Sequence, residues 1–172
     1  WKWTNGSAQK LYSPGNVVPV VSHGKVFIVA PDRYMTAINL ADGKQLWRTN
    51  LNTVREALCL SKDGERVYAK TMNDVLVCVS TASDDFEQVW ASDCKYGYEH
   101  PPCPPAEMEN GLVFLTNRRG QVFAVDGMTG AVKWTFDAGN SAANKIVEGP
   151  DGRAWITLIE GRILSVDPKE IL

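Results

Sequence analysis

Short apolar segments alternate with polar turns along this chain, and the pattern repeats four times. The first segment of each repeat ends in a glycine turn, at residues 17–24, 57–64, 104–111 and 145–152. The second segment of each repeat lies at residues 25–30, 65–71, 112–117 and 153–158. The third segment lies at residues 34–40, 75–81, 121–127 and 162–168. The fourth segment lies at residues 44–50, 86–92 and 131–137. Runs of this length, rich in β-branched and aromatic residues and bounded by Gly, Asp and Asn, are typical of strands. No helical period competes with them.

Tryptophan recurs at a nearly constant position in the repeat. Trp3, Trp47, Trp90 and Trp134 are separated by 44, 43 and 44 residues. A period of this length in an all-β pattern predicts a β-propeller in which each repeat is one four-stranded blade. We therefore expect one propeller segment over residues 1–172, with blades ending near these four tryptophans.

A small residue recurs in the third strand of each repeat, at Ala37, Cys78, Ala124 and Ser165. A small side chain there leaves room for an indole against the backbone, and a buried indole brings a large apolar area and an N–H that needs an acceptor. We expect Trp47 and Trp134 to be mostly buried. We also expect the tryptophans to pack between neighbouring blades and hold them together.

One segment carries a family resemblance. The run from Ala124 through Asp126, Thr129 and Gly130 to Trp134 resembles the tryptophan-docking motif A-x-D-x-x-T-G-x-x-x-W of PQQ-like, quinoprotein-type β-propellers. The other repeats carry degenerate copies. Asn39 and Asp42 replace Asp and Thr in the first, Cys78 and Ser80 replace Ala and Asp in the second, and the last stops after Ser165-Val-Asp167. The resemblance covers essentially the whole chain.

The resemblance implies two classes of function, because this repeat serves scaffolds and enzymes alike. In quinoprotein dehydrogenases the quinone sits between a tryptophan and a disulfide of adjacent cysteines, and Glu, Asn and Asp hold a calcium ion. This chain has no Cys-Cys pair, so we expect no cofactor and favour the BamB-like, non-enzymatic branch of bacterial outer-membrane assembly. The alternative is an accessory propeller of a larger hydrolase, phosphatase or quinoprotein dehydrogenase whose catalytic residues lie outside this chain.

Composition limits the cellular compartments and the classes of binding partner that we expect. The net charge of −2 gives no basic stripe for nucleic acid, and the sequence has no apolar run long enough to span a membrane. The chain has no initiator Met or signal peptide, so we expect it to begin inside a larger precursor. The resemblance implies a periplasmic or otherwise extracytoplasmic protein that binds other proteins, and it allows a lipid anchor in the precursor.

The strand count leaves two arrangements open. Trp1–Thr4 reads as a lone fourth strand, three complete blades follow, and a last blade has three strands, which makes sixteen. The chain could close on itself, with Trp1–Thr4 completing the last blade. It could also be half of a larger ring, since PQQ-like propellers usually have seven or eight blades. We favour the half ring, completed by further blades of the same protein or by a second copy.

Four cysteines allow several interpretations. Cys59 and Cys78 fall at strand positions and read as small buried hydrophobes. Cys94 and Cys103 flank the longest inter-blade loop, where they could form a disulfide, remain free thiols, or bind a metal together with His100. Only three ligands are present, and their spacing matches no standard zinc site.

The candidate binding residues lie in turns and loops. Turns between second and third strands emerge on the same face of a propeller as the inter-blade loops. We therefore expect one face to carry Arg33, Tyr34, Tyr96, Tyr98, Glu99, His100, Arg118 and Arg119. Aromatic and arginine side chains dominate protein interfaces, although any one of these residues could simply be solvated. Neither histidine stands in a recognised catalytic context.

Overall fold

The computed structural model describes residues 1–6, 18–30, 32–95, 103–117 and 119–171. Over these residues it is an all-β structure of fifteen strands in four antiparallel sheets, with a short 3₁₀ helix η1 (Pro168–Glu170) near the C-terminus. Three sheets have four strands and the last has three. The predicted propeller fold is confirmed.

The strand bounds match the predicted segments closely. The first sheet holds β1 (Val20–Ser22), β2 (Lys25–Val29), β3 (Met35–Asn39) and β4 (Gln45–Thr49). The second holds β5 (Val54–Leu60), β6 (Arg66–Thr71), β7 (Val75–Ser80) and β8 (Gln88–Asp93). The third holds β9 (Ala106–Glu107), β10 (Leu112–Thr116), β11 (Gln121–Asp126) and β12 (Val132–Asp137). The fourth holds β13 (Ala143–Glu148), β14 (Ala154–Leu158) and β15 (Ile163–Val166).

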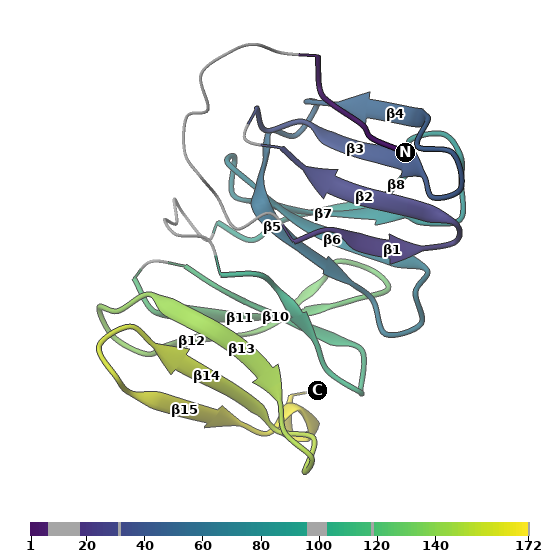
Figure 1. Ribbon diagram of the computed structural model, residues 1–172. Coiled ribbons are helices and arrows are strands. Elements are labelled where there is room, and N and C mark those ends of the chain that lie inside the picture. Colours follow the sequence, from purple (N-terminus) through teal and green to yellow (C-terminus); the bar gives the residue numbers. More distant parts are fainter. Residues whose placement is uncertain (7–17, 31, 96–102, 118, 172) are drawn as a thin grey trace.

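Successive sheets pack face to face along an arc (Figure 1). One apolar core joins the first and second sheets around Phe27 and Val67, and another joins the second and third around Tyr68 and Val113. A third joins the third and fourth sheets around Phe114 and Ile156. The second and third sheets thus pack against a neighbour on both faces, and the first and fourth on one face each, as in other repeat architectures. The first and fourth sheets lie at opposite ends of the molecule in Figure 1, so this is an open arc of blades.

The same cross-strand rung recurs in the first three sheets, and its first two members recur in the fourth. An aromatic residue in the second strand stands opposite the small residue in the third, which stands opposite the tryptophan in the fourth. The rungs are Phe27–Ala37–Trp47, Tyr68–Cys78–Trp90, Phe114–Ala124–Trp134 and Trp155–Ser165. The small central residue lets two large rings share one face of the sheet, since opposite side chains are only about 5 Å apart.

A register shift accompanies each tryptophan. It falls after Ala37, Cys78 and Ala124, and it leaves Leu46, Val89 and Lys133 without a direct partner in the neighbouring strand. An extra residue of this kind bends the strand and re-aims the next side chain. Each of the three unpaired residues directly precedes its tryptophan.

Two expectations are wrong in detail. Trp1–Thr4 forms no strand, because over the described residues it pairs with none of the four sheets. Trp134 is only half-buried, whereas Trp47 is 8% exposed. The reason is that Trp134 lies on β12, an outer strand whose residues are mostly exposed, and it stacks on the equally outlying Phe136 with ring centroids 5.7 Å apart.

Candidate functional site

The antiparallel topology sorts the turns onto two rims of the arc. One rim, called the hairpin rim here, carries the turns between first and second strands and between third and fourth strands. The opposite loop rim carries the turns between second and third strands and the connections from one sheet to the next. The motif and candidate binding residues divide between these rims.

On the hairpin rim, the best copy of the motif forms a closed turn that receives a tryptophan. The Asp126 carboxylate accepts hydrogen bonds from the N–H groups of Met128 and Thr129, each at 2.9 Å. The indole N–H of Trp90, from the preceding sheet, donates to the carbonyl of Gly127 at 3.1 Å. A Cβ on Gly130 would lie 2.6 Å from Cε3 of that ring. Glycine is therefore required here both for contact and for a φ of +77°.

The turn after β3 receives a tryptophan in the same way. Asn39 Oδ1 accepts from the N–H of Ala41 at 2.8 Å, and the indole N–H of Trp1 donates to the Leu40 carbonyl at 2.8 Å. A Cβ on Gly43 would lie 2.5 Å from the Trp1 ring. Leu40 and Gly43 thus correspond to Gly127 and Gly130. The 44-residue spacing pointed to Trp3, but Trp1 makes this contact.

The second sheet lacks this turn, and its contact differs accordingly. Trp47 packs edge-on against Phe86, with ring centroids 5.2 Å apart, in the longer turn between β7 and β8. Its buried indole N–H has no acceptor among the described residues. The longer turn, with Ser80 at the Asp position of the motif, thus replaces a hydrogen-bonded contact with an aromatic one.

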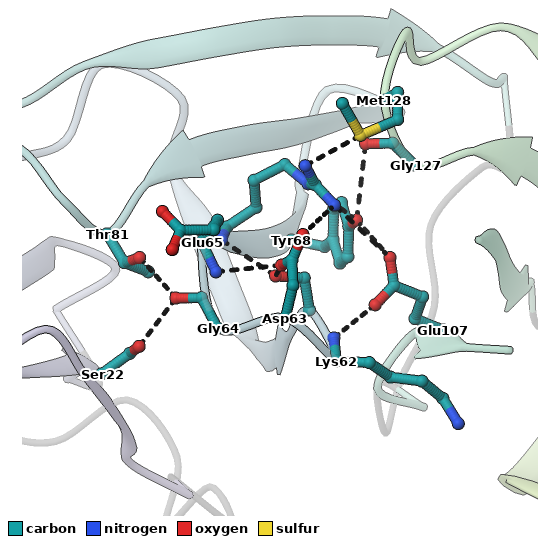
Figure 2. A network of polar contacts seen from close by, with 12 residues as sticks. Ser22, Lys62, Asp63, Gly64, Glu65, Tyr68, Thr81, Glu107, Gly127 and Met128 are labelled. Atoms are coloured by element: carbon teal, nitrogen blue, oxygen red, sulfur yellow. Dashed lines mark hydrogen bonds and ion pairs between the residues drawn. The ribbon is translucent and has the colours of Figure 1, made fainter. Parts of the chain in front are cut away.

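A polar network joins neighbouring sheets on the hairpin rim (Figure 2). The Tyr68 hydroxyl donates to Glu107 Oε1 at 2.8 Å, and Arg66 Nε donates to that hydroxyl at 3.3 Å. Arg66 also contacts Asp63 Oδ2 at 3.1 Å and the sulfur of Met128 at 2.9 Å. Burial is the main cause that raises the pKa of Tyr68 above its ordinary value. The hydroxyl therefore stays protonated and serves as a donor.

Lys62 extends the network across three sheets. Its ammonium contacts Glu109 Oε2 at 3.2 Å and the carboxylate of Glu148, while its backbone N–H donates to Glu107. Glu148 also accepts from the N–H of Glu109 at 2.7 Å. Burial would raise the pKa of Glu148, but the hydrogen bond and charge of Lys62 together with the hydrogen bond from the Glu109 N–H outweigh it, so the pKa is lowered. Opposite charges thus hold the hairpins together.

The loop rim of the first sheet displays Arg33 and Tyr34. Arg33 is exposed, with a φ of +68° in the turn between β2 and β3. The Arg48 guanidinium lies 3.9 Å from the centre of the Tyr34 ring and pairs with Asp32. Asp32 also accepts from the Tyr34 N–H at 3.1 Å. The turn is thereby fixed, and the Arg33 side chain remains on the surface.

The loop rim is continuous from the third sheet to the fourth. Arg119 is exposed, and its N–H is capped by Asn117 Oδ1 at 2.9 Å. The neighbouring Gly120 touches the connection between the sheets, because a Cβ there would lie 2.0 Å from the Gly139 carbonyl oxygen. That connection in turn meets the turn between β14 and β15, where Glu160 pairs with Arg162. The structure therefore places Arg119 and Glu160 on one surface.

Several predicted residues lie outside the described part of the chain: Tyr96, Tyr98, Glu99, His100 and Arg118. The sequence reasoning also missed the residues of the hairpin network. Lys62 and Asp63 lie in the predicted glycine turn that ends at Gly64, and Asp63 stabilises that turn by accepting from the Glu65 N–H at 3.0 Å. No local signal marks Glu107 or Glu148 as partners of Lys62, because they come from other repeats.

All four cysteines are free thiols. Burial is the main cause that raises the pKa of Cys59 to about 11 and of Cys78 to about 12. It also raises the pKa of Cys94. The Cys103 carbonyl accepts from the ammonium of the buried Lys70 at 3.4 Å, which joins this end of the long loop to the second sheet. These thiols behave as packing groups.

A comparison of the sequence with the profiles of known families shows to which family the chain belongs. The sequence profile of the family described as outer membrane protein assembly factor BamB matches residues 2–83 and 35–170. The chain belongs to this BamB family. Among curated relatives, BamB of Salmonella typhimurium is 30% identical over 66 residues, which cover 38% of this chain and 16% of that protein. The predicted PQQ-like, BamB-like resemblance is confirmed.

Solved structures share the fold at low sequence identity. The crystal structure of BamB from Moraxella catarrhalis matches with a TM-score of 0.65 and 18% identity, over 87% of this chain and 44% of that one. Quinohemoprotein alcohol dehydrogenase from Comamonas testosteroni matches with a TM-score of 0.68 and 16% identity, over 92% of this chain and 34% of that one. The chain thus spans less than half of either structure.

The quinone that the repeat family implies does not fit the residues present. The cysteines are scattered at 59, 78, 94 and 103, so no adjacent pair can form the disulfide against which such a quinone stacks. Over the described residues, no three His, Cys, Asp or Glu side chains are grouped so as to hold a metal ion. In that same part of the chain, no helix is long and apolar enough to cross a membrane.

Proposed function

We propose that this chain is a non-catalytic propeller scaffold that binds other proteins during outer-membrane protein assembly in the bacterial envelope. The match to the BamB family across residues 2–170 carries the proposal. Relatives that share a fold can differ in function, so the surface must support the same role.

The loop rim is the surface that we assign to partner binding. Arg33 and Arg119 are exposed on turns that hydrogen bonds hold in place. A side chain presented by a rigid turn loses less conformational freedom on binding. The charged groups that brace the hairpin rim, such as Lys62 and Arg66, are already engaged with acidic neighbours. The loop rim is therefore better suited to receive a partner.

The chemistry of the described residues supports a non-catalytic role. The Cys59 and Cys78 thiols have raised pKa values, so they are poor nucleophiles at neutral pH. His23 contacts Glu65 at 3.0 Å on an exposed edge, and the neighbouring Ser22 hydroxyl donates to the Gly64 carbonyl. We further propose that the chain binds no quinone and works outside the cytoplasm. Saturable uptake of pyrroloquinoline quinone with calcium, followed by absorbance, would contradict the scaffold role.

Capture from detergent-solubilised bacterial envelopes tests the proposal. The tagged chain should retain outer-membrane assembly proteins, identified by mass spectrometry. An Arg33→Ala/Arg119→Ala variant should retain several-fold less of them, because it removes two exposed cations from the loop rim.

A charge-matched variant controls for the loss of two cations. Lys44→Ala/Lys169→Ala removes two exposed lysines from the opposite rim and should bind like the parent chain. Equal capture by all three proteins would contradict the assignment of the loop rim. Capture of no assembly protein by the parent chain would contradict the function itself.

A further inference from the structure

Met128, in the turn between β11 and β12, is the exposed member of the four methionines of this chain. Its residue surface is 65% exposed, whereas Met35 and Met108 are each 1% exposed and Met72 is half-buried. A methionine thioether takes up one oxygen atom from two-electron oxidants and becomes a sulfoxide, and access to the sulfur decides which methionine reacts. Met128 is therefore the methionine that such oxidants reach first.

The Arg66 guanidinium lies directly beside the sulfur of Met128 (Figure 2). Its Nη1 donates to the sulfur at 2.9 Å, whereas Nε donates to the Tyr68 hydroxyl at 3.3 Å and Nη2 to Asp63 Oδ2 at 3.1 Å. A thioether sulfur is a weak acceptor, so Nη1 has a poorer partner than the other two nitrogens. The Arg66 side chain is 13% exposed, and its three contacts hold the guanidinium at the sulfur.

Oxidation of the Met128 sulfur would change this contact. When hydrogen peroxide transfers an oxygen atom to the sulfur, the O–O bond breaks, the sulfur loses two electrons, and the remaining oxygen leaves as water. The sulfoxide oxygen carries partial negative charge, and a hydrogen bond from a charged donor is roughly twice as strong as a neutral one. Because Met128 is already exposed, its side chain can shift outward to admit the new oxygen and gives up little apolar burial.

We propose that Met128 is an oxidation site whose sulfoxide is bound by Arg66, so that two-electron oxidants strengthen the contact between the second and third sheets. Arg66 belongs to β6, and Met128 follows Gly127, whose carbonyl already receives the Trp90 indole. Both sheets have a neighbour packed on each face, so the site is complete within the middle of the arc. Oxidation of a buried methionine disrupts packing, whereas oxidation here adds a hydrogen bond between blades.

Treatment of the purified chain with hydrogen peroxide, followed by peptide mapping and urea unfolding, tests the proposal. Met128 should gain one oxygen at least about tenfold faster than Met35 or Met108. The unfolding equilibrium constant of the oxidised chain should be at least about threefold smaller than that of the reduced chain. Met128→Leu, treated in the same way, controls for oxidation of other side chains and should show no such decrease. Arg66→Ala should remove the decrease, because the sulfoxide then has no guanidinium to bind it.

A second variant tests the same contact without oxidation and with Arg66 in place. Met128→Gln carries a carbonyl oxygen at the δ position, where the sulfoxide carries its oxygen. Its unfolding equilibrium constant should be at least about threefold smaller than that of Met128→Leu. Destabilisation of the parent by oxidation, an equal gain of stability in Arg66→Ala, or equal stabilities of Met128→Gln and Met128→Leu would overturn the proposal. Oxidation of Met35 or Met108 before Met128 in the folded chain would also overturn it.

Discussion

Gly130 lies directly beneath the indole of Trp90, so that a Cβ on Gly130 would approach Cε3 of the ring to 2.6 Å. The ring comes from the fourth strand of one sheet, and the glycine closes a turn of the next. This contact fixes the spacing of neighbouring blades and with it the arc on which the loop rim is displayed.

Gly130→Ala should destabilise the chain through two effects. The left-handed backbone at φ +77° costs a non-glycine residue about 1–2 kcal/mol, and the clash with Trp90 should add roughly 1–3 kcal/mol. Gly152→Ala is the matched control, because Gly152 has a φ of +78° and nothing within 4 Å of an added Cβ. Chemical denaturation measures both variants. Equal losses at the two positions would show that the Trp90 contact contributes nothing.

The tryptophans should differ in their contribution to stability. Trp47→Ala should cost roughly 3–5 kcal/mol, the range for deleting a buried large aromatic side chain, since Trp47 is 8% exposed and packs on Phe27 and Phe86. Trp134→Ala should cost at least about 1 kcal/mol less, because its ring is only half-buried. Urea unfolding followed by circular dichroism compares them. A larger loss at Trp134 would contradict the burial described.

Asp126 should make the chain sensitive to acid. Burial would raise its pKa, but the N–H donors of Thr129 and Met128 outweigh that effect and lower it. Because the folded pKa is below the unfolded value of about 3.9, the stabilisation is present above that value and is lost as the pH falls through the folded pKa. Asp126→Asn keeps an acceptor, as Asn39 does in the first repeat. The variant should lose less stability than the parent chain between about pH 5 and pH 2.

The measurement for Asp126 is the free energy of unfolding at several pH values. Asp151→Asn is a suitable control, because Asp151 is exposed and makes a single 3.2 Å contact with the Arg153 N–H. Identical pH profiles for the parent and Asp126→Asn would contradict the assigned role.

The buried thiols should react slowly in the folded chain. With a pKa of about 12, only ~1 in 10,000 Cys78 side chains is a thiolate at pH 8, against about a quarter of free cysteines. Labelling with a disulfide reagent should therefore be slow in buffer and rapid for all four cysteines in guanidinium chloride. Peptide mapping identifies the site that reacts. Rapid labelling of Cys78 in the folded chain would contradict its burial.

Local sequence pattern was sufficient for the strands and for the pairing of a small residue with a tryptophan, but not for the aromatic residue of the second strand that completes each rung. The glycine turns and β-branched runs located every strand that the structure describes, and the tryptophan period identified the blades. The register shifts at Leu46, Val89 and Lys133 could not be predicted, because they change which residue stands opposite a tryptophan without changing the hydrophobic pattern.

Contacts between residues of different repeats could not be predicted from the sequence. Lys62 reaches Glu148 across 86 residues, and nothing within either turn indicates the partner. The 44-residue spacing favours Trp3, and only the folded position of Leu40 and Gly43 shows that Trp1 makes the contact. For the binding surface, the sequence predicted which turns share a rim, but the pairing of Arg48 with Asp32 and Tyr34 depends on the folded register.

Site-specific photo-crosslinking in living cells tests the proposed scaffold role most directly. A benzophenone amino acid placed at Arg119 on the loop rim should yield adducts with an outer-membrane assembly protein. The same probe at Lys169, which is exposed on the opposite rim, should yield few or none. Adducts formed equally from both positions, or only from position 169, would contradict the account.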